Sequence, residues 1–320
     1  MREYCLSLNE LGEITVYSDI DIISEKLVER KSMVKTIPVG IVYKGISSEI
    51  EKKENYISVL KGNIKKVSID VEKNVAQLIT NSENFFFPDL VYLVTCMFAN
   101  ILQKKGCYIV QSSVVKYDDN HSVMFIGDPN SGKTSMAYNL IKDYGYSLIS
   151  NDNVIVGIEN NKLITILGTK EMQMRYGVMK TYFPEILPFV DIKKSDLGRN
   201  DWDIKVYVDD YIKKNKYKYA EKSIVTDIYN IKTFKEGLTY IREREKIDEI
   251  LLIYEHLTKQ IRSNRYVLFD YDYPLPSFES ITYMQDRYDM AKKICETVNI
   301  YDATGPVKEL SRRITRKYER

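Results

Sequence analysis

The sequence predicts an α/β protein with a strand-rich beginning and helices at its C-terminal end. Runs rich in β-branched residues, at 36–43 and 67–80, favour short strands in the first 81 residues. In the middle of the chain, an apolar strand, a glycine-containing loop, a helix and another strand follow one another. After residue 234, charged and apolar residues interleave at helical spacing. We therefore expect a β-rich subdomain over residues 1–84 and a larger α/β domain over residues 85–320.

Composition excludes several classes of protein. The chain has 320 residues, of which 44% are hydrophobic and 29% charged, so it can bury a core and is too apolar to be disordered. Its 47 basic and 45 acidic residues give a net charge of +2. A general nucleic-acid-binding protein would carry a large basic excess, so we expect no nucleic-acid partner.

Cysteine usage indicates a reducing compartment. Cys5, Cys96, Cys107 and Cys295 are scattered, form no CxxC pair and are accompanied by only two histidines. This pattern disfavours a zinc site and fits a cytosolic protein. The first residues also lack the apolar core of a signal peptide, so we expect a cytoplasmic protein.

Residues 85–102 are almost entirely apolar and predict a buried helix. Pro88 and Asp89 suit a helix start, and Gly106 suits its end. The charge-free part is shorter than the roughly 20 residues that a membrane span requires, so we expect no membrane partner.

The remaining elements are predicted from apolar periodicity and turn residues. Strands are expected at 108–116, 123–126, 147–150, 153–158, 163–167 and 266–271, and helices at 133–144, across most of 234–263, at 280–298 and at 306–317.

The most specific motif is GDPNSGKT at residues 127–134, which matches G-x-x-x-x-G-K-[ST] at every fixed position. An apolar strand enters the motif and a helix leaves it, as a phosphate-binding loop requires. Glycines let backbone N–H groups surround an anion, and the helix N-terminus adds positive charge. Nucleotide contacts are therefore expected from Gly127, Asp128, Pro129, Asn130, Ser131, Gly132, Lys133, Thr134 and Ser135.

Within this motif, Lys133 would reach the β- and γ-phosphates and Thr134 would offer its hydroxyl to Mg²⁺. Such loops usually have a second acid at the end of a neighbouring strand. Asp152, after the strand at 147–150, is the candidate for this metal ligand. Asn-Asp-Asn is also ordinary turn chemistry, which is the structural alternative for Asp152.

The segment GDPNSGKTSMAYNLIKDYGYSLISNDNVIV resembles the core of HPr kinase/phosphorylase and its divergent relatives, which include peptide kinases of modified-peptide pathways. In that family a short phosphate loop, a helix, a glycine and an apolar strand lead to two adjacent aspartates. Gly145 stands at the glycine, and Asn151-Asp152 stand at the aspartates. The resemblance implies an HPr kinase/PEP carboxykinase-like P-loop core.

The same resemblance implies further site residues and two departures. It places Arg175 near the phosphates and a lysine, Lys205, on a later strand, although both would also suit ordinary surface charges. The family histidine is replaced by Gln111 and the first aspartate, its probable base, by Asn151. An amide cannot accept a proton at neutral pH, so deprotonation of a substrate at this position is in question.

Taken with the motif, the resemblance implies an ATP- and Mg²⁺-dependent phosphotransferase acting on a serine or threonine hydroxyl of a peptide or small protein. Lys133, Asp152, Arg175 and Asn151 are its candidate catalytic residues. The alternative is a nucleotide-binding regulatory or assembly protein with a degenerate catalytic site. The identity of the phosphate acceptor, the choice of ATP or GTP and the oligomeric state stay open.

The basic segment at 213–222 interleaves lysine and tyrosine. It is either a solvated loop or a site for an acidic peptide or single-stranded nucleic acid.

Overall fold

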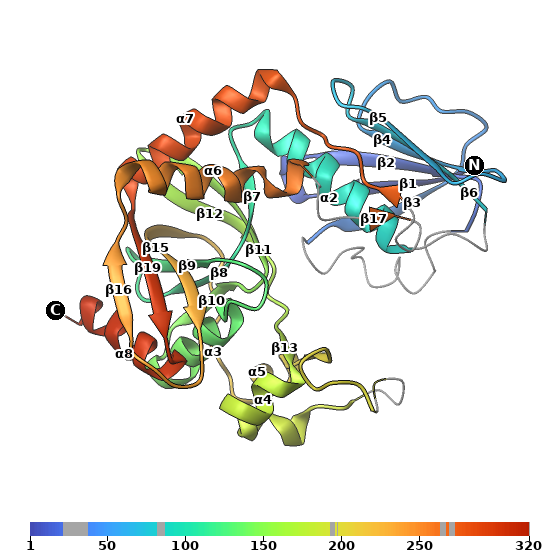
Figure 1. Cartoon of the computed structure of the whole chain (residues 1–320). Coiled ribbons are helices and arrows are strands. Elements are labelled where there is room, and N and C mark those ends of the chain that lie inside the picture. Colours follow the sequence, from blue (N-terminus) through green and yellow to red (C-terminus); the bar gives the residue numbers. More distant parts are fainter. Residues whose placement is uncertain are drawn as a thin grey trace. The chain divides into compact units, whose positions relative to one another are not determined.

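The computed structural model describes residues 1–21, 38–81, 87–192, 196, 198–262, 267–268 and 273–319 of a mixed α/β protein (Figure 1). The chain divides into two compact units, each formed from two stretches of sequence. One unit combines Met1–Val110 with Leu251–Lys292, and the other combines Gln111–Ile250 with Lys293–Arg320. The expected boundary between residues 84 and 85 lies outside the described residues and stays a prediction.

The first unit contains a sheet with strand order β3-β1-β2-β4-β6-β5. Alternation of buried and exposed positions places one face of these strands in the core, as in β6. The expected strand at 67–80 is in fact two strands joined by a turn, and residues 36 and 37 of the other expected strand lie outside the described residues. The strands are β1 (Arg2–Ser7), β2 (Glu13–Ser18), β3 (Gly40–Ile46), β4 (Tyr56–Lys61), β5 (Lys66–Asp70) and β6 (Val75–Thr80), with a short helix η1 (Asn9–Leu11) between the first two.

The apolar helix α2 (Phe87–Gln103) packs against this sheet and is largely buried, as its composition predicts. Asn100 Nδ2 donates to Val71 O at 2.9 Å and to Asn74 Oδ1 at 3.1 Å, which ties the helix to the β5–β6 turn. Residues 85 and 86 of the expected helix lie outside the described residues. In the part of the chain that the structure describes, no helix combines the length and apolarity needed to cross a membrane.

Later helices complete the first unit. Arg287, on α7 (Ile281–Thr297), is fully buried, pairs with Glu279 and donates to Gln103 Oε1. Most of the expected helix at 234–263 is α6 (Lys246–Arg262). Of the expected strand at 266–271, Val267–Leu268 form β17, which pairs with β18 (Tyr273–Pro274), and the rest lies outside the described residues.

The second unit is built on a larger sheet, in which strand order β10-β8-β9-β15-β12-β11 places β9 and β15 at the centre. All five side chains of β9 are buried, which explains its continuous apolar sequence. The expected strand at 108–116 is broken at Ser112 into β7 and β8. Most of β7 (Tyr108–Gln111) belongs to the first unit. The strands of the second unit named here are β8 (Ser113–Lys116), β9 (Ser122–Ile126), β10 (Ser147–Ser150), β11 (Asn153–Glu159), β12 (Lys162–Gly168) and β15 (Ser223–Thr233).

The structure contains strands where the sequence predicted a helix or no element. The helix predicted from residue 234 begins only at 246, because β16 (Tyr240–Glu243) pairs antiparallel with β19 (Asn299–Gly305). β19 in turn pairs parallel with β15 over its whole length. Neither β15 nor β19 was predicted. Polar residues interrupt the apolar pattern of both segments. They form strands because they pair with strands that are distant in the sequence.

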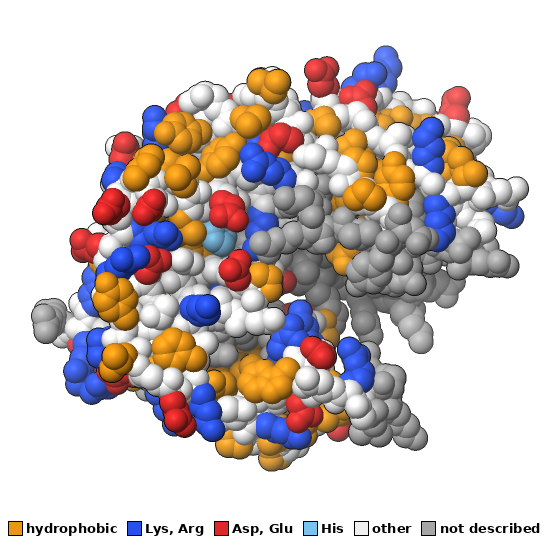
Figure 2. Space-filling view, in the orientation of Figure 1, with side chains coloured by type: hydrophobic (Ala, Val, Ile, Leu, Met, Phe, Trp, Pro, Cys, Tyr) orange, Lys and Arg blue, Asp and Glu red, His pale blue; other side chains and the backbone are white. Residues whose placement is uncertain are grey.

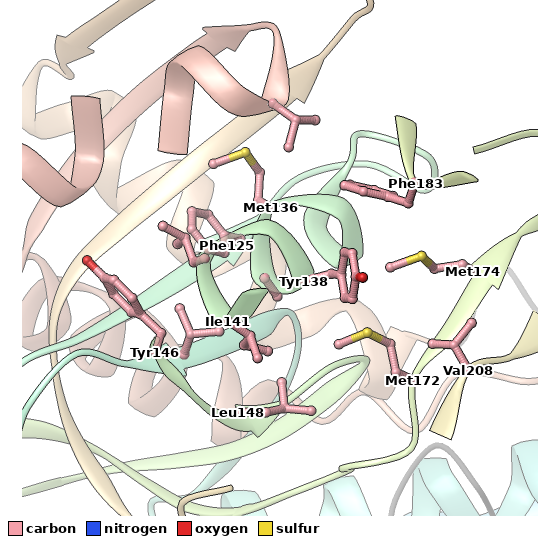
Figure 3. Packing of buried hydrophobic residues seen from close by; sticks show 14 of the residues in the cluster. Phe125, Met136, Tyr138, Ile141, Tyr146, Leu148, Met172, Met174, Phe183 and Val208 are labelled. Carbon is pink, nitrogen blue, oxygen red and sulfur yellow. The ribbon is translucent and has the colours of Figure 1, made fainter. Parts of the chain in front are cut away.

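Helices α3 (Lys133–Tyr144) and α8 (Val307–Tyr318) contact one another and the buried face of this sheet. α3 matches its predicted bounds because Gly145, with φ 72°, ends it in the left-handed conformation and donates its N–H to Leu140 O. Figure 3 shows Phe125 of β9 beside Met136 of α3, both in this core.

A smaller layer packs on the outer side of α3 and carries part of the candidate site. The ring of Tyr138 on α3 packs edge-to-face against Phe183, with 4.7 Å between the ring centroids. Figure 3 shows Met172 and Met174 around the Tyr138 ring. The elements of this layer are β13 (Gln173–Arg175), α4 (Tyr176–Tyr182), η2 (Pro184–Phe189), β14 (Lys205–Tyr207) and α5 (Asp209–Lys214).

Candidate functional site

The expected phosphate-binding motif forms a tight loop, residues 127–132, between β9 and α3; we call it the glycine loop. Three of its residues adopt left-handed backbone angles: Gly127 with φ 136°, Asn130 with φ 69° and Gly132 with φ 101°. Ser131 N donates to Asp128 O at 3.1 Å and closes a turn inside the loop. Alternation of left-handed and ordinary residues creates the concave backbone that binds anions in many proteins.

The end of β15 lies directly under the glycine loop. Thr233 N donates to Ser131 O at 2.8 Å. A Cβ added at Gly132 would lie 1.9 Å from Thr233 Oγ1, and one at Gly127 would lie 2.8 Å from Ile231 O. Both glycines are therefore required by backbone conformation and by contact with β15.

Lys133 folds back over the loop that precedes it. Its Nζ donates to Gly127 O at 2.9 Å and to Asp128 O at 2.8 Å. These carbonyls hold the ammonium group at the loop, where phosphate oxygens can take their place. Thr134 is half-buried and Ser135 is buried, both in the first turn of α3, whereas Asp128 and Pro129 are exposed.

The Asn151-Asp152 turn lies at the same edge of the sheet as the glycine loop. β8 runs antiparallel between β9 and β10, so the carboxyl ends of these two strands face the same way. Ser113 of β8 pairs with Phe125 on one side, and its Oγ donates to Asn151 O at 2.6 Å on the other. With strands about 4.8 Å apart, the turn begins about 10 Å from the start of the loop.

Several backbone bonds fix this turn. Ser112 N donates to Asp152 O at 2.9 Å, and Asn151 N donates to Thr169 O at 2.8 Å. Thr169 Oγ1 accepts from the N–H groups of Asp152 at 3.3 Å and Asn153 at 3.2 Å. Because the main chain uses Thr169 for both bonds, the Asp152 carboxylate is not needed to close the turn.

Asn151 is 5% exposed, and its amide is only partly satisfied. Nδ2 donates to Glu171 O at 3.4 Å, while Oδ1 has no hydrogen-bond partner within the described part of the chain. Gln111, expected in the place of a histidine, immediately precedes Ser112 and so lies at this same edge. The edge therefore presents amide groups where proton transfer would need an acid or an imidazole.

Arg175 connects the outer layer to the glycine loop. Its Nε donates to Asn130 Oδ1 at 2.8 Å, and the same guanidinium donates to the carbonyl of Trp202 and lies 3.8 Å from an Asp203 carboxylate oxygen. Lys205, the other basic residue expected at the site, is the register partner of Arg175 across β13 and β14 and is exposed.

Thr233, Thr169 and Trp202 also shape this region, and the sequence analysis did not identify them. Thr233 and Thr169 act through the main chain and belong to no motif. Of the three, Trp202 alone could have been singled out from the sequence, because it is the only tryptophan of the chain.

The basic segment at 213–222 is mostly exposed and is tied to β10 by main-chain contacts. Tyr219 bridges to Leu148 of β10, and Ala220 N donates to Leu148 O at 2.9 Å. Lys222 pairs with Glu159 at 3.1 Å. On the face drawn in Figure 2, basic and acidic side chains are interspersed over the described surface.

Comparisons with known proteins do not assign this chain to a family. No protein-family model matches the chain, and no curated protein matches it. Among solved structures, the HPr(Ser) kinase/phosphatase from Coxiella burnetii is similar, with 14% identity and a TM-score of 0.31 over 66% of this chain and 99% of that one. At this identity and TM-score, the similarity does not establish a family for the chain.

Proposed function

We propose that this protein is a nucleotide-dependent phosphotransferase with an HPr kinase-like P-loop core, which transfers the γ-phosphoryl group of ATP to a serine or threonine hydroxyl of a peptide or small protein. One observation carries the proposal: the glycine loop, the Asp152 turn and Arg175 meet at one edge of the sheet, although they come from separate stretches of sequence. Phosphoryl transfer depends mainly on positioning and charge, which these groups would provide.

The residues have distinct roles in this proposal. The glycine loop and the first turn of α3 would bind the phosphates, with Lys133 exchanging its carbonyl partners for phosphate oxygens. Thr134 and Asp152 would hold Mg²⁺, which neutralises phosphate charge when bound. Arg175 would donate to the transferring group while its second branch stays on the Trp202 carbonyl.

The donor set fits a nucleotide and a magnesium ion. Buried Ser131 Oγ lacks a hydrogen-bond partner among the residues described, so a polar group at the loop is unsatisfied. The Asp152 turn is closed by Thr169, which leaves its carboxylate available as an oxygen ligand.

The amides at this edge favour a second candidate, a nucleotide-binding regulatory protein with a degenerate catalytic site. Asn151 would bind an acceptor hydroxyl without taking its proton, which would then pass to water or to a phosphate oxygen. Transfer would be slower than in a site with a carboxylate base, by roughly 10²–10⁴-fold.

Intact-mass measurements separate the two candidates. The protein is incubated with MgATP and a serine- and threonine-containing peptide library, and MgATP binding is measured by calorimetry. A gain of one phosphate that is lost in Lys133→Ala, but kept in the exposed-surface control Lys162→Ala, supports the phosphotransferase. Binding without any modified peptide supports the regulatory protein, and absence of binding contradicts both. Asn151→Asp is expected to raise the transfer rate, because it restores a carboxylate at the buried position.

A further inference from the structure

Trp202 presents a large aromatic surface beside the glycine loop. Its ring is 47% exposed, whereas most bulky side chains of this unit are buried. A Cβ added at Gly177 would lie 2.8 Å from Cδ2, 3.0 Å from Cε2 and 3.1 Å from Cγ of the indole. A point so close to three consecutive ring atoms lies over the ring face, so Gly177 packs against one face of the indole, while about half of the residue stays exposed.

The ring is held in place by the main chain around it. Trp202 N donates to Asn200 Oδ1 at 3.0 Å, and Gly177 N donates to Asp201 O at 2.9 Å. Lys180 of α4 pairs with Asp201 at 2.7 Å. A ligand that stacks on this ring would therefore find it already ordered, which reduces the entropy lost on binding.

Arg175 ties the main chain at Trp202 to the glycine loop. One guanidinium donates both to the Trp202 carbonyl and to Asn130 Oδ1 of the loop. Because both donor nitrogens are bonded to the same carbon, the main-chain carbonyl of Trp202 and the Asn130 side chain of the loop are separated by the width of one guanidinium. The indole is attached to the same residue as that carbonyl, so a nucleoside that extends several bonds beyond phosphates in the loop can reach it.

The geometry points to Trp202 as the platform on which the base of the bound nucleotide stacks, an inference that rests on the proposed nucleotide site. Within the described part of the chain, no aromatic side chain or cation stacks on Trp202, so its exposed surface is available to a ligand. Every nucleobase has a π-face, so stacking tolerates different bases. We therefore expect ATP and GTP to bind with similar affinity.

Comparison of ATP with tripolyphosphate isolates the base. Both ligands, as magnesium complexes, are titrated by calorimetry into the wild-type protein and into Trp202→Leu, which keeps an apolar side chain against Gly177 but cannot stack. Trp202→Phe retains a π-face, and Tyr240→Leu removes another exposed aromatic, 53% exposed, from β16. Trp202 is the only tryptophan, so its fluorescence reports any change at the ring directly.

The expected result is that Trp202→Leu binds ATP about tenfold more weakly and tripolyphosphate as tightly as the wild type does. Trp202→Phe should keep most of the ATP affinity, and Tyr240→Leu should keep all of it. If Trp202→Leu retains the wild-type ratio of ATP to tripolyphosphate affinity, the inference is wrong while the proposed function stands. If the wild-type protein binds neither ligand, the proposed function fails and the inference fails with it.

Discussion

Arg175 Nε donates a 2.8 Å hydrogen bond to Oδ1 of Asn130, which lies 45 residues earlier in the glycine loop. The bond joins β13 to the loop that follows β9. Asn130 has φ 69°, a conformation that asparagine tolerates better than most residues, so this position supplies both the turn and the amide acceptor.

Arg175→Ala should lower the rate of phosphoryl transfer by about 10²–10³-fold, because a positioned cationic donor to the transferring group is lost. Arg175→Lys should recover little, since an ammonium group cannot bind Asn130 and the Trp202 carbonyl as one rigid fork. Arg199→Ala is the control, since Arg199 is 55% exposed and pairs only locally with Asp196. Equal rates for the Arg175 and Arg199 variants would contradict a role for Arg175.

Lys133→Ala should weaken MgATP binding by roughly 10–100-fold, the effect of removing a charged hydrogen-bond donor. Its thermal unfolding temperature should change little, because the two bonds that Lys133 makes to loop carbonyls connect neighbouring residues only. Calorimetry and thermal unfolding on the same sample test both expectations. A large loss of stability would instead assign Lys133 a structural role.

Gly132→Ala should destabilise the protein far more than Gly145→Ala does. Both glycines flank α3 with positive φ, so each alanine costs roughly 1–2 kcal/mol from the backbone. At Gly145 a Cβ meets nothing within 4 Å, whereas at Gly132 it would lie 1.9 Å from Thr233 Oγ1. Urea unfolding of the two variants gives the difference, and similar unfolding midpoints would refute close packing of β15 under the loop.

A buried carboxylate anchors the last turn of α8 to the sheet. Asp227 is 1% exposed and accepts from Lys317, Tyr318, Thr226 and Asn299. Burial alone would raise the pKa of Asp227, but the hydrogen bonds from Lys317 and Tyr318 hold the pKa below its ordinary value of 3.8. Burial likewise opposes the charge of Lys317, yet its bonds to Asp227 and Tyr301 raise its pKa above 10.5.

These shifts predict how stability depends on pH. The lowered pKa of Asp227 contributes stability above about pH 4 that is lost as the pH falls through the folded-state value. The raised pKa of Lys317 contributes stability below about pH 10 that is lost as the pH rises through its folded-state value. Unfolding free energies measured from pH 3 to pH 11 should decline at both ends.

Asp227→Ala should cost about 3 kcal/mol at pH 7 and flatten the decline at low pH, because it removes a buried carboxylate and leaves Lys317, which is 38% exposed, and the other donors without their partner. Glu309→Ala is the control on the same helix: its bonds to Arg312 and Arg313 are exposed and should contribute little. If the two variants lose the same stability, the C-terminal turn is not anchored through Asp227.

Sequence patterns within a short segment were sufficient to predict the part of the candidate site that lies on one continuous stretch of chain. The sequence predicted α3 and β10 with the bounds that the structure has, because left-handed glycines at residues 132 and 145 mark both ends of the helix. The same reasoning identified the glycine loop and Asp152, whereas Arg175 was proposed only from the resemblance to the HPr kinase family. Whether these residues bind nucleotide and metal stays a prediction.

Local signals failed where a strand depends on distant partners. β16 was assigned to a helix because its charged residues match helical spacing, yet it pairs with β19. β15 was missed because polar residues such as Asp227 and Asn230 interrupt its apolar pattern, and those residues are satisfied by contacts with α8 and with Asp302. Such contacts cannot be read from a short window of sequence.

The sequence by itself therefore determined the loop, its helix and the residue types available for phosphate chemistry, because glycine, lysine and threonine at fixed spacing encode a local conformation. Only the tertiary structure decided which distant groups meet that loop. β15 passes beneath it, β8 holds the Asp152 turn at the same edge, and β13 brings Arg175, which also binds the Trp202 carbonyl, beside it. The physical reason is that hydrogen bonds between strands and the packing of buried side chains, which connect residues far apart in the chain, set these positions.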